Sequence, residues 1–159
     1  MNIKHLLASL LLPVALWANA VPFTVSADGQ EVTDTKTGLI WRRCAEGMTA
    51  SGGTCTGTAS TFMHEAALTR ASTQATATGV AWRLPNVKEL SSIADKSRSN
   101  PAIDTAAFPA TPASWFWSSS PYIGDANHAW GVNFYYGYVY YGFYGRDNSV
   151  SVRLVRAGQ

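Results

Sequence analysis

The sequence predicts an α+β fold, with two helices in the middle of the chain and strands toward both ends. Residues 60–78 contain no glycine or proline and are rich in alanine, which favours a helix. Along residues 130–134 and 150–155, apolar side chains recur at every second position, the period of a half-buried strand. Helices set between strands indicate packed layers, with a small mixed or antiparallel sheet and a loop-rich C-terminal half.

The composition is that of a globular domain, because 47% of the 159 residues are apolar and only 14% are charged. The formal net charge is +2, and the longest basic block is Arg42-Arg43. Proteins that bind nucleic acids usually carry a pronounced basic patch. No nucleic-acid partner is therefore expected.

Residues 1–20 have the features of an export signal peptide. A short positive head precedes an apolar run over residues 6–16, and Ala18-Asn19-Ala20 has the small-x-small pattern of a cleavage site. The run is too short to cross a bilayer, which takes about 20 residues. We expect residues 21–159 to form a single secreted, periplasmic or cell-surface domain without a transmembrane segment. A buried N-terminal helix is the alternative.

The two cysteines, Cys44 and Cys55, follow the predicted signal and are separated by a flexible stretch that contains residues 51–53. In an exported protein such a pair is expected to form a disulfide. Closing so short a loop stabilises the fold by roughly 2 to 3 kcal/mol in the chain-entropy model. A zinc site needs more ligands than His64 can add, so no metal and no cofactor are expected.

The first half of the domain contains a predicted strand pair and a helix. Residues 25–41 predict two strands, joined by a turn at residues 34–38. The helix over residues 60–78 is closed by Gly79, a common residue at helix C-termini.

A second helix is predicted over residues 86–96. Asn86 and Glu89 form an N-x-x-E capping box directly after Pro85. Apolar residues then recur at helical spacing, at Val87, Leu90, Ile93 and Ala94.

Residues 101–121 predict a proline-rich loop that ends in a buried aromatic strand around Trp117. The periodic or helix-flanking positions of Trp82, Trp117 and Trp130 suit a core. The terminal strand around residues 153–156 is expected to be scaffold as well.

The most unusual composition lies at residues 134–144, where six of the seven tyrosines of the chain fall within residues 135–144. Tyrosines occupy both strand parities, so some rings face water or a partner. Tyrosine with Gly, Ser and Asn is the chemistry of antibody-type recognition loops. Packing of this segment on itself or on a second subunit is the structural alternative. The predicted ligand-binding residues are Asp125, Asn127, His128, Asn133, Tyr135, Tyr136, Tyr138, Tyr140, Tyr141, Phe143, Tyr144, Asp147 and Asn148.

Catalytic motifs are incomplete, so no catalytic residue is predicted. The sequence from His64 to Leu68 begins like a zinc-protease motif, but Leu68 stands where the second histidine is needed. His64 is interpreted as an ordinary exposed helix residue. Residues 125–127 open like a calcium loop, but Ala129 and Trp130 interrupt it.

Several motifs together resemble the Lcl C-terminal domain family over essentially the whole predicted mature chain. The carrying residues are Asp34, Thr37-Gly38-Leu39, Trp41, Arg43, Trp82-Arg83-Leu84-Pro85-Asn86, Lys88-Glu89-Leu90, Phe116-Trp117-Ser118-Ser119, Ala129-Trp130, Val132, Phe134, Gly137 and Val152-Arg153-Leu154-Val155-Arg156. The resemblance implies a C-type-lectin-like fold in exported bacterial proteins that bind surfaces, including adhesins that recognise sulfated glycans. It implies a binding family and not an enzyme family.

The C-terminal region also resembles the variable proteins of diversity-generating retroelements, which display a mutable patch on lectin-like folds. Randomised Asn-type codons give residues such as Tyr, Asn, Asp, His, Ser and Gly but not Lys, Glu, Gln, Met or Trp. Residues 122–149 contain none of the excluded types except Trp130. The resemblance makes Trp130, Val132, Phe134 and Gly137 framework.

The sequence thus predicts an exported, adhesin-like domain that binds a cell-surface protein or glycan through its last forty residues. The alternatives are an enzyme related to formylglycine-generating enzymes, which also resemble lectins, and a structural subunit that self-associates through the tyrosine-rich segment.

Overall fold

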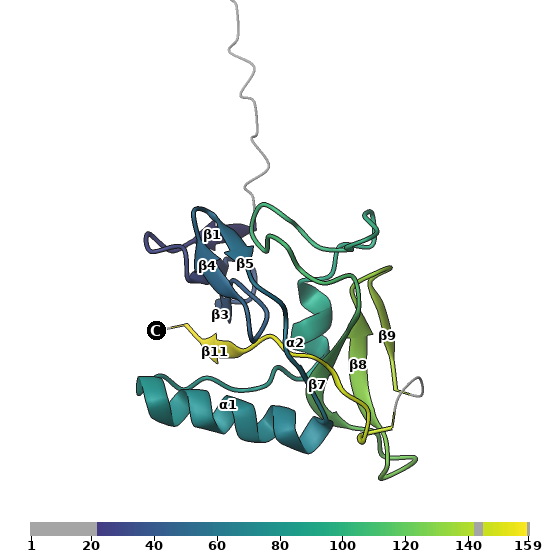
Figure 1. Cartoon of the computed structure of the whole chain (residues 1–159). Helices are drawn as coiled ribbons and strands as arrows, with labels where there is room; N and C mark the ends of the chain where they lie inside the picture. The colour runs from purple at the N-terminus through teal and green to yellow at the C-terminus, as the bar shows by residue number, and fades with distance from the viewer. Residues whose placement is uncertain (1–21, 142–144, 159) are drawn as a thin grey trace, which may run out of the picture.

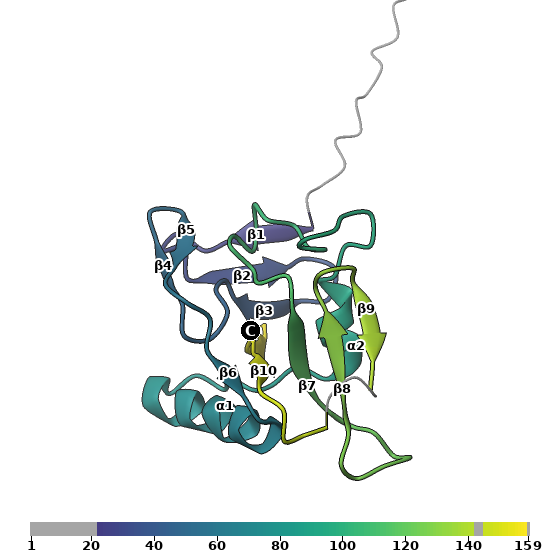
Figure 2. The same ribbon diagram turned by 45° about the vertical axis from the view of Figure 1, so that its right-hand side comes forward.

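The computed structural model describes residues 22–141 and 145–158, in which two helices and three sheets are found. The predicted signal peptide, residues 1–20, lies outside the described residues, as do Phe143 and Tyr144. Figures 1 and 2 show the two larger sheets side by side, with helix α1 running below them. The α+β class predicted from the sequence is confirmed.

A four-stranded antiparallel sheet brings the N-terminal part of the domain together with its C-terminus. Its order is β1-β2-β3-β11. The strands are β1 (Phe23–Val25), β2 (Glu31–Asp34), β3 (Leu39–Arg42) and β11 (Val155–Ala157). The predicted turn at residues 34–38 joins β2 to β3. The Asp34 carboxylate closes this turn, because it accepts hydrogen bonds from the Lys36 amide (2.9 Å) and the Thr37 hydroxyl (2.7 Å).

The second, five-stranded sheet has the order β6-β10-β7-β8-β9. Its strands are β6 (Thr61–Phe62), β10 (Val150–Ser151), β7 (Trp115–Pro121), β8 (Ala129–Asn133) and β9 (Tyr138–Tyr140). Strand β10 runs parallel to β7, whereas the other pairs are antiparallel, so the sheet is mixed. Strand β9 forms one edge of this sheet, as Figure 2 shows.

The stretch between the cysteines is an ordered hairpin and not the flexible stretch expected from its glycines. Strands β4 (Thr49–Ser51) and β5 (Thr54–Thr56) pair in antiparallel register around Gly52 and Gly53. The predicted disulfide between Cys44 and Cys55 is confirmed and fastens this hairpin to the loop that precedes it.

Helix α1 (His64–Thr78) confirms the first predicted helix, although it begins four residues later than expected. Gly79 ends it in the left-handed conformation, as predicted. The interpretation of His64 as an exposed residue is wrong, because only 2% of it is accessible. Its Nε2 lies 2.9 Å from the carbonyl of Ser118, and its ring meets Trp117 edge to face. Burial lowers the pKa of His64, which keeps the buried imidazole neutral.

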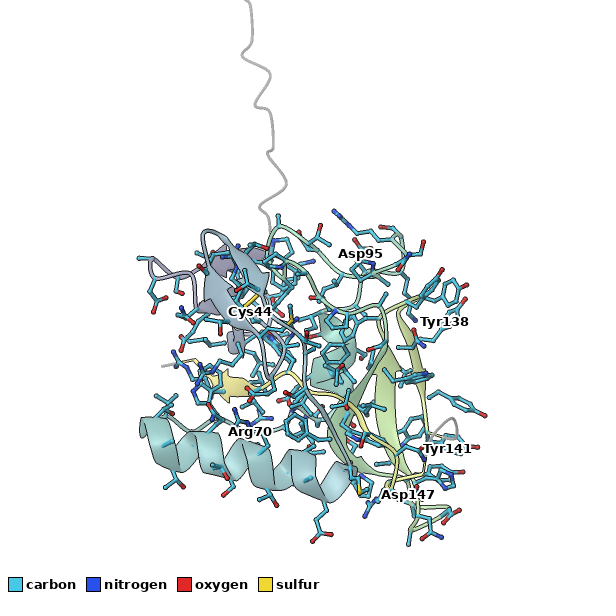
Figure 3. The ribbon with its side chains drawn as sticks, viewed as in Figure 1. Cys44, Arg70, Asp95, Tyr138, Tyr141 and Asp147 are labelled. Atoms are coloured by element: carbon cyan, nitrogen blue, oxygen red, sulfur yellow. A yellow bond between two sulfur atoms is a disulfide. The ribbon has the colours of Figure 1, made fainter. Side chains whose placement is uncertain are left out.

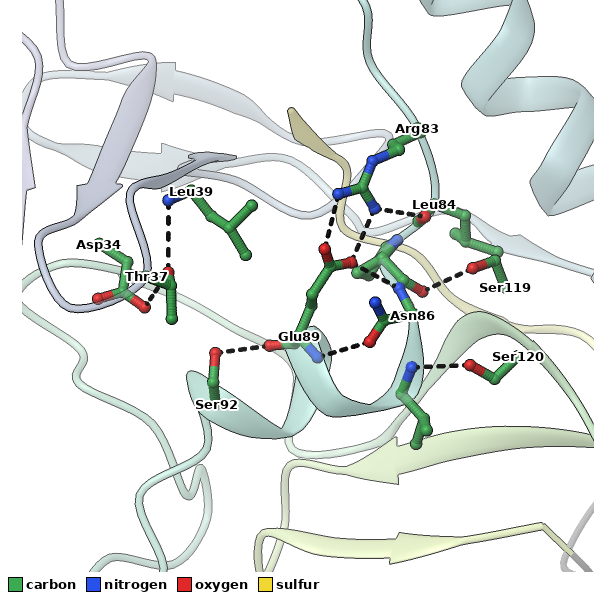
Figure 4. A network of polar contacts seen from close by, with 12 residues as sticks. Asp34, Thr37, Leu39, Arg83, Leu84, Asn86, Glu89, Ser92, Ser119 and Ser120 are labelled. Atoms are coloured by element: carbon green, nitrogen blue, oxygen red, sulfur yellow. Dashed lines mark hydrogen bonds and ion pairs between the residues drawn. The ribbon is translucent and has the colours of Figure 1, made fainter. Parts of the chain in front are cut away.

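Helix α2 (Val87–Ser92) begins at the predicted capping box, which Figure 4 shows from close by. The Asn86 side chain accepts from the Glu89 amide, and the Glu89 carboxylate accepts from the Asn86 amide (2.9 and 2.8 Å). Glu89 also receives two hydrogen bonds from the Arg83 guanidinium, each 2.7 Å long. The helix ends at Ser92, before the predicted Lys96, because the Ile93 amide already turns back to the Ser91 carbonyl.

Two buried apolar clusters hold these layers together. One contains Leu90 of α2, Trp41 and Phe116 from the two large sheets, and Phe134, which directly follows β8. The other lies against α1 and includes Trp82, Trp117 and Leu154. Trp82 and Trp117 are therefore core residues, as predicted.

The C-terminal segment is buried more completely than its alternating pattern indicates. Every residue from Val150 to Val155 is buried, so the prediction of a half-buried strand is wrong. The side chain of Arg153 is enclosed and donates to the backbone carbonyls of Arg42 and Arg43 and to the Thr111 hydroxyl. Because these acceptors pair with both terminal nitrogens of the guanidinium, a charged residue occupies a position that the pattern assigned to the solvent side. Its Nε has no hydrogen-bond partner among the described residues.

Within the described part of the chain, no helix is long and apolar enough to cross a membrane.

Candidate ligand-binding surface

The exposed tyrosines predicted from the sequence lie on and around the edge strand β9. In the antiparallel pair, Asn133 of β8 stands opposite Tyr138, and Gly131 stands opposite Tyr140. All three residues of β9 are exposed, whereas the facing Val132 of β8 is fully buried. The sheet therefore ends in a strand whose side chains are available to a partner.

A tight turn between β8 and β9 sets this geometry. Gly137 has a positive φ of 77°, and its amide donates to the Asn133 carbonyl (2.7 Å). A Cβ at position 137 would lie 3.2 Å from the Lys96 Cγ, so Lys96 would have to shift slightly. The left-handed conformation is what favours glycine at this position. The Asn133 side chain fixes the turn further, since its Oδ1 accepts from the Tyr135 amide (2.7 Å).

The tyrosines at the turn form one group of rings. The centroids of Tyr135 and Tyr136 are 4.4 Å apart, and those of Tyr136 and Tyr138 are 5.8 Å apart. These three residues are between 38% and 61% exposed. Ring contacts of this kind hold exposed aromatic side chains in a defined arrangement before any ligand arrives.

A second group of rings lies at the other end of β9. Tyr140 and Tyr141 contact each other with centroids 5.1 Å apart, and Tyr141 stacks on Tyr122 at 3.6 Å. Trp130 meets both Tyr122 (5.8 Å) and Tyr141 (5.1 Å) at steep angles. A side-chain hydrogen bond with Tyr122 raises the pKa of Tyr141, so the Tyr141 hydroxyl stays un-ionised at neutral pH.

Trp130 differs from the other two tryptophans predicted to be core. It is only partly buried, and its ring contacts the surface residues Tyr122 and Tyr141. The prediction of a core position is wrong for Trp130, because its ring belongs to neither buried cluster and lies against Tyr122 in the loop after β7. We call Trp115, Tyr122, Trp130, Tyr135, Tyr136, Tyr138, Tyr140 and Tyr141 the aromatic surface.

An open groove of about 860 Å³ lies along one side of β9. Its lining residues are Lys96, Trp115, Asn133, Tyr136, Tyr138, Val139 and Tyr140. The lining contains one cationic side chain and no carboxylate. Lys96 forms no ion pair with any described residue, so the groove offers a positive charge beside aromatic rings.

Apart from Asn133 of β8, the predicted polar residues lie in two loops, at residues 125–128 and 145–148. The Asp125 carboxylate accepts from the Asn127 amide (2.8 Å) and lies 2.9 Å from the His128 Nδ1. The backbone hydrogen bond from Asn127, followed by the contact with His128, lowers the pKa of Asp125. The loop of residues 145–148 adjoins this one, since the Arg146 amide donates to the Asn127 carbonyl (2.8 Å).

Asp147 and Asn148 belong to this second loop and are exposed. The side-chain Nδ2 of Asn148 donates to the Asp147 carboxylate (3.1 Å). Figure 3 shows Asp147 beyond Tyr141 on the same side of the molecule, with Tyr138 at the opposite end of β9. The fold thus places the described members of the predicted set along one side.

Some residues of this surface are missing from the set predicted by sequence. Trp115 belongs to β7, Tyr122 lies in the loop after β7, and Lys96 follows α2. Only the pairing of β7 with β8 and the packing of Lys96 on Gly137 bring them to β9. The one signal in the sequence was the aromatic character of residues 115–122.

Features of other kinds of site are sparse among residues 22–141 and 145–158. No group of three or more His, Cys, Asp or Glu side chains there could hold a metal ion. Both cysteines are used in the disulfide, and Figure 3 shows Cys44 in the opposite half of the view from Tyr138 and Tyr141.

Fold and surface together define an α+β domain that exposes a broad aromatic surface at the edge of its larger sheet. The chain belongs to the Lcl C-terminal domain family, whose model matches residues 30–156. This membership confirms the family resemblance and is consistent with a surface or ligand-binding domain. No similar protein was found among curated proteins or solved structures.

Proposed function

We propose that this protein is an exported, adhesin-like domain that recognises a cell-surface protein or glycan through the aromatic surface. The observation that carries the proposal is the group of exposed tyrosines on and beside β9, at the edge of a sheet whose inner strands β10, β7 and β8 carry mostly buried or half-buried side chains. Solvent-exposed aromatic clusters on a monomeric domain mark interaction sites more often than chance.

The chemistry of the surface supports recognition. Tyrosine offers a large contact area with little rotamer entropy to lose, and its hydroxyl group can pair with polar ligand groups. Ring contacts among Tyr135, Tyr136 and Tyr138 reduce that entropy cost further. The loops at residues 125–128 and 145–148 supply a polar surround.

We further propose that the fold is C-type-lectin-like and that residues 122–149 are diversified by a retroelement. Family membership supports the first part. For the second, two of the four expected framework residues, Val132 and Phe134, are fully buried, and Gly137 adopts a conformation that suits glycine. The exposed tyrosines, by contrast, can vary without disturbing the core.

Export is supported by the disulfide, since such bonds persist in oxidising compartments. Mass spectrometry of protein recovered from the periplasm or medium tests this. The expected mass is that of a chain that begins at Val21 and lacks the two thiol protons. A retained N-terminus would contradict the proposed localisation.

We propose binding without catalysis. A formylglycine-generating enzyme needs reactive or copper-binding cysteines, and here both cysteines form a disulfide away from the aromatic surface. Self-association through β9 is a second candidate, favoured by the unprotected edge of the sheet. Sedimentation of the mature protein distinguishes a monomeric receptor from a self-associating subunit.

The test of the proposal is a screen of the mature domain against sulfated glycans and against surface proteins. A variant with Tyr136, Tyr138 and Tyr140 changed to Ser is run beside it. The control variant changes Met63 and Leu68 to Ser, because these residues are similarly exposed but lie at and within α1. The proposal expects ligands that bind the parent and the control variant but not the tyrosine variant.

A further inference from the structure

The direction in which the backbone N–H and C=O groups of β9 point follows from the hydrogen bonds between β7 and β8. The Phe134 amide donates to the Ser114 carbonyl, and the Trp130 carbonyl accepts from the Ser118 hydroxyl, so even-numbered residues of this segment point their backbone groups toward β7. Because such groups alternate along an antiparallel strand, Gly131 and Asn133 point theirs toward β9.

The register then assigns the groups of β9 itself. Tyr138 and Tyr140 stand opposite Asn133 and Gly131 and bond inward to β8. The N–H and C=O of Val139 therefore point away from the sheet, to its open edge. An added strand would find one donor and one acceptor there in the correct spacing.

Among the described residues, this edge carries none of the usual protection against pairing. Natural edge strands carry lysine, proline or a bulge, or are covered by another segment. Strand β9 reads Tyr-Val-Tyr, residues with high strand propensity. The outer edge of the four-stranded sheet at β11 is covered, since Arg83 and Val155 exchange backbone hydrogen bonds of 2.9 and 3.0 Å.

The groove beside β9 indicates which side chains an added strand should carry. Its aromatic walls suit apolar side chains, and Lys96 suits a carboxylate. The side-chain NH₂ group of Asn133 adds a donor, because the side-chain oxygen already accepts from the backbone N–H of Tyr135. The described lining has no acid that would repel an anionic partner.

We propose that β9 binds an extended acidic peptide segment of a partner protein by adding it as a further strand. Val139 supplies the main-chain hydrogen bonds, apolar side chains of the peptide enter the groove, and one carboxylate meets Lys96. The inference rests on the proposed function, because it uses the same surface. A second copy of this chain fits less well, since its β9 brings no acid to Lys96.

The experiment selects peptides on the immobilised mature domain from a phage-displayed library of linear dodecapeptides. Enriched peptides are synthesised, and their dissociation constants are measured for the parent, Val139→Pro and Val139→Thr. Proline removes only the outward amide, and edge strands tolerate it there. Threonine keeps that amide. A matched peptide with alternate amides N-methylated tests strand addition on the unaltered protein.

The proposal expects acidic peptides with alternating strand-forming residues. Val139→Pro and N-methylation are each expected to weaken binding by about tenfold or more, and Lys96→Gln to weaken it at low salt. Failure to enrich any peptide, or peptides that bind equally well when N-methylated, would overturn strand addition. N-methylated peptides could still bind the parent but fail to bind the Tyr136/Tyr138/Tyr140 variant. That result would reject strand addition and leave the proposed function of the aromatic surface standing. If no peptide binds and the protein instead self-associates in a way that Val139→Pro abolishes, the edge of β9 pairs with a second copy of the chain.

Discussion

Tyr122 and Tyr141 stack almost in parallel, with ring centroids 3.6 Å apart and an angle of 11° between the ring planes. The contact joins the loop after β7 to the end of β9, two segments that are not adjacent in sequence. It extends the aromatic surface beyond the tyrosine-rich segment and ties the two sides of that surface together.

We predict that Tyr122 and Tyr141 are energetically coupled. Stacked aromatic pairs are stabilised by about 0.5 to 1.5 kcal/mol beyond the area they bury. In urea unfolding, the double variant Tyr122→Ser/Tyr141→Ser should therefore lose less stability than the two single variants combined. Strictly additive losses would show that the two rings lie near each other without interacting.

A second prediction separates two tryptophans. Trp117 is 3% exposed, and its indole N–H donates to the Phe62 carbonyl (2.8 Å), so Trp117→Ala should destabilise the fold by about 3 to 5 kcal/mol. Trp130 is partly exposed and its ring meets Tyr122 and Tyr141, so Trp130→Ala should destabilise the fold by about 1 to 2 kcal/mol. Chemical denaturation measures both, and equal losses would place Trp130 in the core.

The third prediction concerns the enclosed Arg153. Burial lowers the pKa of Arg153 to about 9, so it is a buried cation at neutral pH. Its guanidinium also lies over the Phe108 ring, 4.9 Å from the centroid. Arg153→Ala removes the donor for two backbone carbonyls and leaves a cavity, so it should cost about 3 to 5 kcal/mol.

Thr111→Val is the milder comparison for Arg153→Ala, since it removes one hydrogen bond from the guanidinium (2.8 Å) and the bond that the Thr111 hydroxyl donates to the Phe108 carbonyl (2.8 Å). It should cost about 1 to 3 kcal/mol. A melting temperature that Arg153→Ala leaves unchanged would contradict the structural role given to Arg153.

The fourth prediction follows from the capping box of α2. Hydrogen bonds from Arg83, opposed in part by burial, lower the pKa of Glu89. A carboxyl whose pKa is lower in the folded state stabilises the fold fully above its unfolded pKa and loses that effect as the pH falls through the folded value. The loss of melting temperature between about pH 5 and pH 3 should be smaller in Glu89→Gln than in the parent. Identical pH profiles would show that Glu89 does not contribute.

Local signals predicted much of the fold, because their chemistry acts within a few residues. The Asn86–Glu89 capping box, the turn closed by Asp34 and the helix stop at Gly79 all lie where the sequence indicates. The burial of Arg153 and His64 could not be predicted, because their partners are backbone carbonyls from distant segments. A periodic pattern records polarity but not whether a buried polar group will find a partner.

The same division holds for the candidate site. Composition alone indicated that some tyrosines of residues 135–141 are exposed, since both parities of a half-buried strand cannot be hidden, and Tyr135, Tyr136, Tyr138 and Tyr140 are exposed. Tyr122 and Lys96 could not be predicted, because strand pairing and the fit of Lys96 against Gly137 bring them there.

The most direct test of the account compares ligand affinity and melting temperature for one pair of variants. The ligand is one found in the screen of glycans and surface proteins. Buried aromatic anchors at interfaces often contribute 2 kcal/mol or more each, so Tyr138→Ser should raise the dissociation constant about 30-fold. Met63→Ser, on the α1 side, should leave it within about twofold.

Both residues are more than half exposed, so both variants should melt within about 3 °C of the parent. Loss of affinity in Tyr138→Ser at an unchanged melting temperature is the result that the account predicts. Unchanged affinity across single and combined tyrosine variants would contradict it, and so would a simultaneous loss of fold and binding.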